Sequence, residues 1–314
     1  MKIYHVDLEN PIQMEEQITA CIGYFDGLHL GHQKLIEKVV SDANIHHTTP
    51  SLITFEPDPW TILKHIKDIP HITPMKQRIE IGEKLGIKNW IILNFKQEMA
   101  DLSIQDFHEK VLLPLRLHTL VCGYDFHYAT RGSGSVTTLK QQTNFQVDVV
   151  EEVSSEHQKI SSTRIEELLR SGNISKANQF MGRVYELRGK VIKGRQVGSE
   201  NGFPTANIAL EENYIIPKKG VYIGKVKVQG RLYSAILNIG NNPTYNYQEH
   251  VSIEAHLLEF HENIYGEEVS FFFCEYIREE KKFKDVFALG EQLTRDVSNA
   301  KDYFKKRREV NVCD

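Results

Sequence analysis

Two histidines, His29 and His32, lie three residues apart in a stretch that also contains Gly23, Gly27 and Gly31. Imidazoles can donate hydrogen bonds to phosphate, and glycines let a backbone approach a ligand closely. The pattern HxGH does not decide the chemistry alone, because two histidines near a turn are also typical of surface or metal-binding positions. The flanking segments are therefore needed to interpret it.

The residues on either side of this stretch predict a strand followed by a helix. Residues 18–24 are a run of β-branched and aromatic residues, whereas Leu35, Ile36, Val39 and Val40 recur at helical spacing. A turn between a strand and a helix points unpaired N–H groups and the positive end of the helix dipole at a phosphate. The stretch therefore predicts a nucleotide site.

The complete stretch GYFDGLHLGH (23–32) resembles the GxFDGxHxGH motif of the FAD synthetase branch of the nucleotidylyltransferases, the prokaryotic riboflavin kinase/FMN adenylyltransferase family. The resemblance implies catalytic roles for both histidines. It also implies that ATP is bound by Gly23, Phe25, Asp26, Gly27, His29 and His32.

Two later stretches resemble the same family. Residues 123–126 (GYDF) are similar to its GxDF motif, which implies that Asp125 and Phe126 contact the flavin. Residues 160–164 (ISSTR) resemble its ISST signature, where hydroxyl groups, N–H groups and a cation can clamp phosphates at a helix start. The phosphate-binding residues would be Ser161, Ser162, Thr163 and Arg164. Out of this context, a turn with core aromatics and an ordinary helix cap explain the two stretches.

Four positions depart from the family pattern. Glu166 replaces an arginine after the ISST signature, Asp58 stands where a histidine is common, and Tyr128 and Ala129 stand where phenylalanine and glycine often follow GxDF. We expect these changes to alter phosphate binding and to leave the HxGH core intact.

The second half resembles the riboflavin kinase module through residues 202–207 (GFPTAN) and Glu254. The resemblance implies that Glu254 takes the proton from the ribityl terminal hydroxyl, although strand alternation alone also explains a polar residue there. Ser199 and Asn242 replace arginines, which predicts a weak kinase. The implied ATP-binding residues are Gly194, Gly202, Pro204, Thr205 and Asn207, the last two also meeting Mg²⁺.

A change of periodicity near residue 182 predicts two domains. Residues 1–182 alternate strands and helices, as in an α/β Rossmann-like nucleotidylyltransferase domain. Residues 183–314 predict a small antiparallel β-barrel built from short strands with Gly, Pro and Asn turns. A C-terminal helix should dock on the barrel through Val286, Leu289, Leu293, Val297, Ala300 and Phe304.

Composition restricts the partners. The 314 residues are 40% hydrophobic and carry a net charge of −4, so no global field favours nucleic acid. The basic residues 305–308 are better explained as a helix end. The chain lacks an apolar leader or an apolar run of about 20 residues, which predicts a cytoplasmic protein without a membrane partner. Cys21 and Cys122 lie in apolar strand-like runs and are expected to be buried thiols.

The predicted function is FAD synthesis from FMN and ATP, with phosphorylation of riboflavin to FMN in the second domain and Mg²⁺ as cofactor. Alternatives are a monofunctional FAD synthetase with an inactive flavin-binding domain, a flavin-sensing regulator, or another nucleotidylyltransferase. The kinase-like half argues against the last of these. The oligomeric state stays open.

Overall fold

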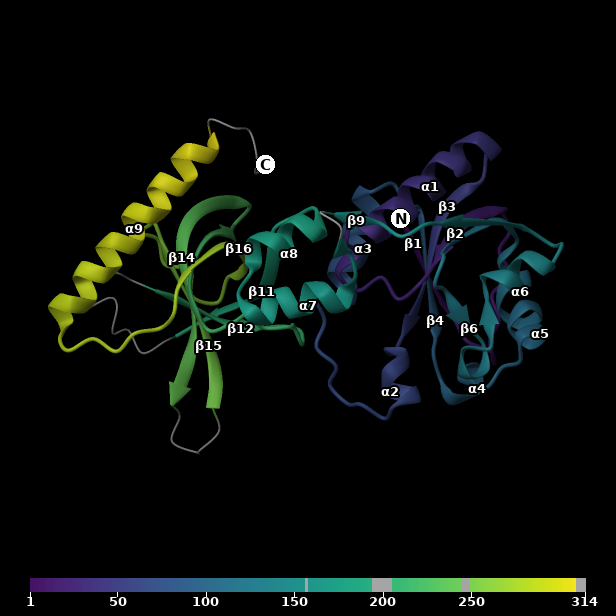
Figure 1. The fold of residues 1–314 in the computed structure, drawn as a ribbon, viewed down its shortest axis with the longest axis horizontal. Coiled ribbons are helices and arrows are strands. Elements are labelled where there is room, and N and C mark those ends of the chain that lie inside the picture. Colours follow the sequence, from purple (N-terminus) through teal and green to yellow (C-terminus); the bar gives the residue numbers. More distant parts are fainter. Residues whose placement is uncertain (156–157, 194–204, 244–248, 309–314) are drawn as a thin grey trace. The chain divides into compact units, whose positions relative to one another are not determined.

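The computed structural model describes residues 1–155, 158–193, 205–243 and 249–308. They form two compact units, Met1–Ser162 and Thr163–Asp314, which are drawn in Figure 1. The functional boundary predicted at residue 182 stays a prediction.

The first unit is built on a six-stranded parallel sheet with the order β1-β4-β3-β2-β5-β8. The α/β expectation for this half is confirmed, although the edge strand β1 was not predicted. Strands β3 and β4 lie on one side of β2, and the chain then crosses to β5 on the other side. The strand order therefore reverses between β2 and β5. The strands are β1 (Lys2–Val6), β2 (Ile18–Ile22), β3 (Thr49–Glu56), β4 (Asn89–Asn94), β5 (Leu117–Gly123) and β8 (Gln146–Val150).

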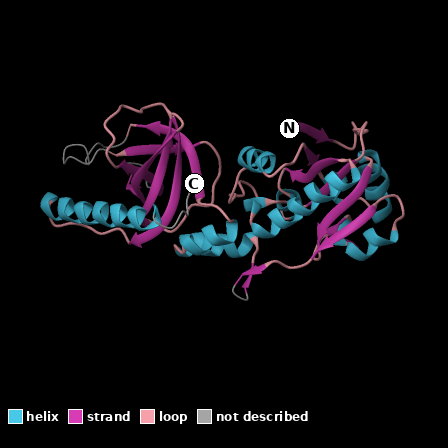
Figure 2. Ribbon diagram, turned by 90° about the horizontal axis from the view of Figure 1, so that it is seen from above, coloured by secondary structure: helices cyan, strands magenta, loops and turns pink. Residues whose placement is uncertain are grey.

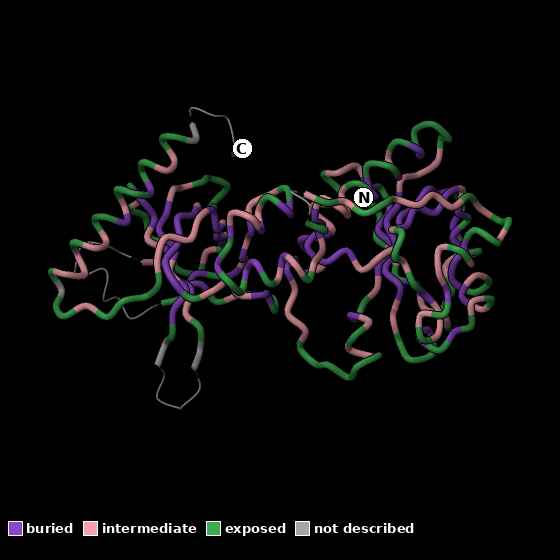
Figure 3. Tube along the Cα trace, in the orientation of Figure 1, coloured by how far each residue is buried: buried purple, intermediate pink, exposed green. Residues whose placement is uncertain are grey.

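Both faces of this sheet are covered, as the continuous apolar strands require. On β4, Trp90 and Ile92 pack in a cluster with Leu35 and Val39 of α1, while Ile91 packs in the cluster on the other face. Buried residues therefore follow the strands in Figure 3. The helical segments are α1 (Leu30–His46), α2 (Pro59–Leu63), α3 (Met75–Lys84), α4 (Gln97–Ala100), α5 (Ile104–Phe107) and α6 (Val136–Gln141), with a π-helical turn at His108–Leu112 and 3-10 turns at Asp26–Leu28, Leu113–Leu115 and Thr130–Gly132.

Cys21 and Cys122 are buried free thiols, as predicted, and burial raises the pKa of Cys122 to about 11.

Short elements complete the first unit. The remaining strands are β6 (His127–Tyr128), β7 (Gly134–Ser135), β9 (Ser154–Ser155) and β10 (Gln158–Lys159).

The second unit is a closed antiparallel barrel with the order β11-β12-β15-β14-β13-β16 (Figure 2). Pairing of Tyr185 with Phe273 closes it between β11 and β16. The sequence predicted five of these strands, at residues 185–193, 221–228, 232–239, 251–258 and 269–277, and missed β12. The elements are α7 (Ser162–Ser171), α8 (Ile174–Met181), β11 (Tyr185–Ile192), β12 (Ala206–Leu210), β13 (Gly220–Val228), β14 (Arg231–Pro243), β15 (Glu249–Leu257), β16 (Glu268–Arg278) and α9 (Val286–Arg308).

Helix α9 docks on the barrel through part of the predicted face. Val297, Ala300 and Phe304 pack in a cluster with barrel residues such as Ile223, whereas the side chain of Val286 lies outside the described residues. The docking also uses a buried ion pair that the sequence did not indicate, because Nη2 of Arg278 on β16 lies 2.6 Å from Oδ2 of Asp296 on α9.

Candidate functional site

The glycine-rich stretch forms a tight turn between β2 and α1. Phe25 adopts a left-handed conformation with φ of 59°, and Gly27 has φ of 80°. A Cβ at Gly23 would lie 3.3 Å from the Phe25 ring, so the small residue lets that ring pack under the turn. This local geometry delivers the chain to the start of α1 with the two histidines at its first turn.

The two imidazoles are stacked, with ring centroids 3.6 Å apart and planes 17° apart. His29 is the N-cap of α1, and its Nδ1 accepts a hydrogen bond of 3.3 Å from the backbone N–H of His32. Since Nδ1 is an acceptor, a neutral His29 carries its proton on Nε2 and can donate from that atom. A Cβ at Gly31 would lie 3.1 Å from the His29 ring, which explains the glycine between the histidines.

Asp26 lies inside this turn and is buried. Its carboxylate accepts hydrogen bonds from the N–H groups of Ile72 (3.1 Å) and Thr73 (2.9 Å) and forms an ion pair of 3.1 Å with Arg78. Asp26, which the motif predicted to contact ATP, therefore links the turn to α3 and the segment before it. Arg78 was missed, because nothing in its sequence context separates a buried arginine from an exposed helical one.

The GxDF motif begins at Gly123, the last residue of β5, which pairs with β2, so both motifs leave the carboxyl ends of neighbouring strands where the strand order reverses. Such crevices are where open α/β sheets bind ligands. Nζ of Lys159 lies 2.9 Å from Asp125 and 2.7 Å from the hydroxyl of Tyr124. These two groups raise the pKa of Lys159, a cation that the motif analysis did not single out. Phe126 stacks on Tyr128 with centroids 5.9 Å apart.

The ISST residues lie at the start of α7. Ser162 donates a hydrogen bond of 2.8 Å from its hydroxyl to the backbone carbonyl of Asp26, so it contacts the histidine-bearing turn. Ser161 precedes it, and Thr163 and Arg164 continue the helix. Nη1 of Arg164 lies 2.8 Å from the carboxylate of Glu167. Glu166, which stands where the family has an arginine, forms an ion pair of 2.8 Å with Arg170.

In the barrel, strand register brings the predicted kinase residues together. Asn207 on β12 lies opposite Glu254 on β15, and Asn238 on β14 lies opposite Glu254 from the other side. Directly opposed residues have Cβ atoms about 5 Å apart, so Glu254 is flanked by two amides. The Asn238 amide donates a hydrogen bond of 3.3 Å to Glu280, a carboxylate that the motif analysis missed.

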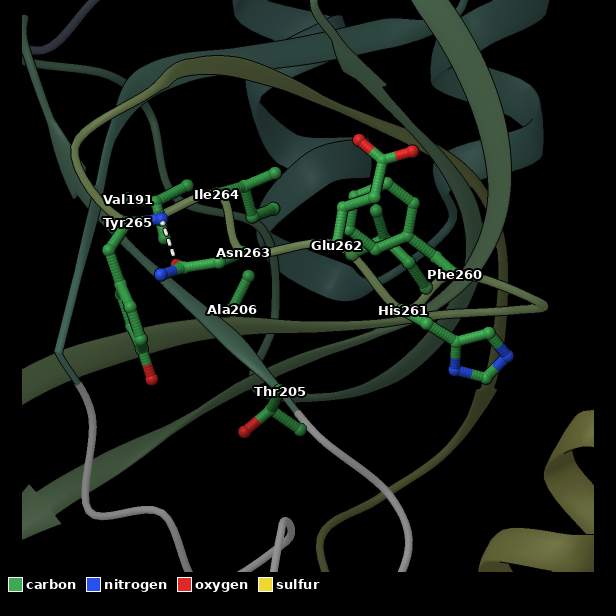
Figure 4. A pocket seen from close by; sticks show the side chains of 10 residues that line it. Val191, Thr205, Ala206, Phe260, His261, Glu262, Asn263, Ile264 and Tyr265 are labelled. Atoms are coloured by element: carbon green, nitrogen blue, oxygen red, sulfur yellow. Dashed lines mark hydrogen bonds between the residues drawn. The ribbon is translucent and has the colours of Figure 1, made fainter.

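A cavity of about 340 Å³ opens beside these strands (Figure 4). Thr205 and Ala206 line one part of it, and the segment from Phe260 to Tyr265 lines another, with the Tyr265 N–H donating 3.1 Å to the Asn263 side chain. Gly194, Ser199, Gly202 and Pro204 lie outside the described residues, as does the side chain of Asn242. Among residues that the structure describes, no group of three or more His, Cys, Asp or Glu side chains could hold a metal ion.

Comparisons with known proteins match both halves. A family model described as FAD synthetase matches residues 12–164, and one described as riboflavin kinase matches residues 181–304. A bifunctional riboflavin kinase/FMN adenylyltransferase of Listeria monocytogenes is 35% identical, covering 95% of this chain and 98% of its own. The Bacillus subtilis protein of the same name is 35% identical, covering 98% of this chain and 100% of its own.

A solved structure from Streptococcus pneumoniae, titled as a macrolide-efflux protein, superposes with a TM-score of 0.91 and 28% identity. The match covers 96% of this chain and 99% of that one. Within the described ranges of the present chain, no helix has the length and hydrophobicity needed to cross a membrane.

Proposed function

Because the chain belongs to the family of bifunctional riboflavin kinase/FMN adenylyltransferases, we propose that its two sites divide the family's reactions between His29 with His32 and Glu254 with Asn207. The family assigns the chain both FAD synthesis and riboflavin phosphorylation, so a regulator or an inactive kinase-like half is not favoured. ATP, FMN and riboflavin are the substrates. We also propose that the protein is located in the cytoplasm.

For FAD synthesis, a phosphate oxygen of FMN attacks the α-phosphorus of ATP, and the bond to the bridging oxygen of the departing pyrophosphate breaks. Negative charge grows on the pyrophosphate as that bond breaks. The stacked imidazoles at the N-terminus of α1 support a site for this charge, since Nε2 of His29 can donate a hydrogen bond to it. The turn and Ser162 position the nucleotide, and positioning supplies much of the rate of such transfers.

For riboflavin phosphorylation, Glu254 accepts the proton of the terminal ribityl hydroxyl. The oxygen of that hydroxyl attacks the γ-phosphorus of ATP, and ADP leaves. The flanking amides of Asn207 and Asn238 support this role, because they can orient the carboxylate. The Thr205 hydroxyl and the Asn207 amide oxygen would hold Mg²⁺ together with ATP phosphates. Oxygen donors in small number fit this ion, whose charge neutralises the phosphates when bound.

The stacked histidine pair carries the proposal for the first site, and a reciprocal experiment tests the assignment. We expect His32→Ala to abolish most FAD formation from FMN and MgATP while FMN formation from riboflavin continues. Glu254→Gln should do the reverse. Products are separated by chromatography, and circular dichroism checks folding of both variants. Loss of both activities in either folded variant would contradict the division of labour.

A further inference from the structure

The histidine-bearing turn is held from behind by a buried arginine. The side chain of Arg78, on α3, is 2% exposed, and its Nη1 donates a hydrogen bond of 3.1 Å to the carbonyl oxygen of Tyr24. Its Nε donates to the carbonyl of Thr73 at 2.5 Å, and its ion pair with Asp26 completes the contacts to the turn. Arg78 thus contacts the two residues that flank Phe25, just before the first histidine.

An imidazole outside the sequence motifs also contacts this arginine. Nη2 of Arg78 lies 3.2 Å from Nδ1 of His71, in the segment between α2 and α3. An arginine can only donate hydrogen bonds, so this contact requires a lone pair on Nδ1. His71 is therefore neutral in this arrangement and carries its proton on Nε2. Burial, followed by the charge of Arg78, lowers the pKa of His71, which favours the same form.

The remaining neighbours of His71 fit this assignment. The Tyr24 hydroxyl lies 3.1 Å from Nδ1 but donates its single proton to the Asp58 carboxylate, which also accepts from the N–H of Trp60 at the start of α2. The charged groups facing His71 are Arg78, Asp26 and Asp58. Asp58, which stands where the family commonly has a histidine, thus takes the proton of the Tyr24 hydroxyl and leaves Nδ1 of His71 to Arg78.

We propose that His71 is a positioning residue for adenylyl transfer, whose neutral imidazole holds Arg78 against the turn that carries His29 and His32. Protonation at Nδ1 would put a second N–H against the Arg78 donor and a second positive charge beside the guanidinium. The contacts to Tyr24 and Asp26 would loosen, and the histidine pair would lose its alignment. This inference rests on the proposed adenylyltransferase function.

The test compares two variants at residue 71. His71→Leu removes the acceptor, and we expect kcat for FAD formation to fall at least tenfold across pH 5–8.5. His71→Asn supplies a carbonyl oxygen near the position of Nδ1 that cannot be protonated. It should recover most of the lost kcat, and the midpoint of its acidic limb should lie at lower pH than in wild type.

Controls separate this proposal from the assignment of the reaction. FAD formation by wild type at pH 8 tests the proposed function itself, and circular dichroism with thermal unfolding of each variant reports that the unit containing residue 71 is folded. His118→Asn, which changes a histidine whose ring lies tilted against that of His46 at 4.3 Å, should keep the wild-type acidic limb. Wild-type kcat in His71→Leu, or an unmoved acidic midpoint in His71→Asn, would overturn the proposal.

Discussion

Substituting Gly31 by alanine tests whether the position of the His29 imidazole limits adenylyl transfer. A Cβ at residue 31 would lie 3.1 Å from Nδ1 and Cε1 of His29, closer than ordinary van der Waals contact. The imidazole would have to move by a few tenths of an ångström. That movement disturbs both its stacking on His32 at 3.6 Å and its hydrogen bond to the His32 N–H.

The expected effects on stability nearly cancel. Alanine is favoured over glycine in a helix by about 1 kcal/mol, whereas losing an N-cap hydrogen bond costs about 0.5–2 kcal/mol. The free energy of unfolding should therefore change by no more than about 1 kcal/mol. The rate of catalysis has no such compensation, because misplacing a reacting or catalytic group by about 1 Å can lower the rate about a hundredfold. For the smaller shift at His29 we expect about a tenfold loss of kcat/KM, equal to about 1.4 kcal/mol.

The assay follows FAD formation from FMN and MgATP in parallel with thermal unfolding. Gly290→Ala is the matched control, because a Cβ at this α9 position meets nothing within 4 Å. It should gain up to about 1 kcal/mol of stability and keep wild-type FAD formation. A Gly31→Ala protein that forms FAD at the wild-type rate would refute the reasoning, since the ring position would then not matter.

Three further predictions concern stability. Ala129 adopts φ of 61° and ψ of −176°, a region essentially reserved for glycine, so Ala129→Gly should raise the free energy of unfolding by about 1 kcal/mol in chemical denaturation; a lower value would contradict the strain. Asp296→Ala leaves Arg278 without its buried partner and should cost about 3–5 kcal/mol, measured by calorimetry, with Asp296→Asn milder. Burial lowers the pKa of His108, so stability should fall as pH drops below about 6.5 towards the folded pKa; His108→Gln should flatten this dependence, and an unchanged slope would count against it.

The sequence determined those parts of the first site that are local. A strand, a glycine-rich turn and a helix start are set by neighbouring residues, so the stretch from Gly23 to His32 predicted that two imidazoles would lie at a helix start. In the structure His29 is the N-cap of α1 and Gly31 lies against its ring. Helical spacing likewise predicted the face of α9 that packs on the barrel.

Tertiary structure alone decided the pairings between distant residues. Glu254 lies between Asn207 and Asn238 because closure of the barrel sets the register of three strands, and register follows from packing of the whole sheet. Strand β12 was missed for a related reason: its first two residues, Ala206 and Asn207, belong to the GFPTAN motif, whose glycine and proline are typical of a turn.

The network behind the histidines was equally hidden from the sequence. A buried Arg78 is tolerated only because Asp26, two carbonyl groups and His71 satisfy its donors together. These partners come from separate segments of the chain. Each looks ordinary alone, and their chemistry exists only once the fold has removed them from water and brought them within hydrogen-bond distance.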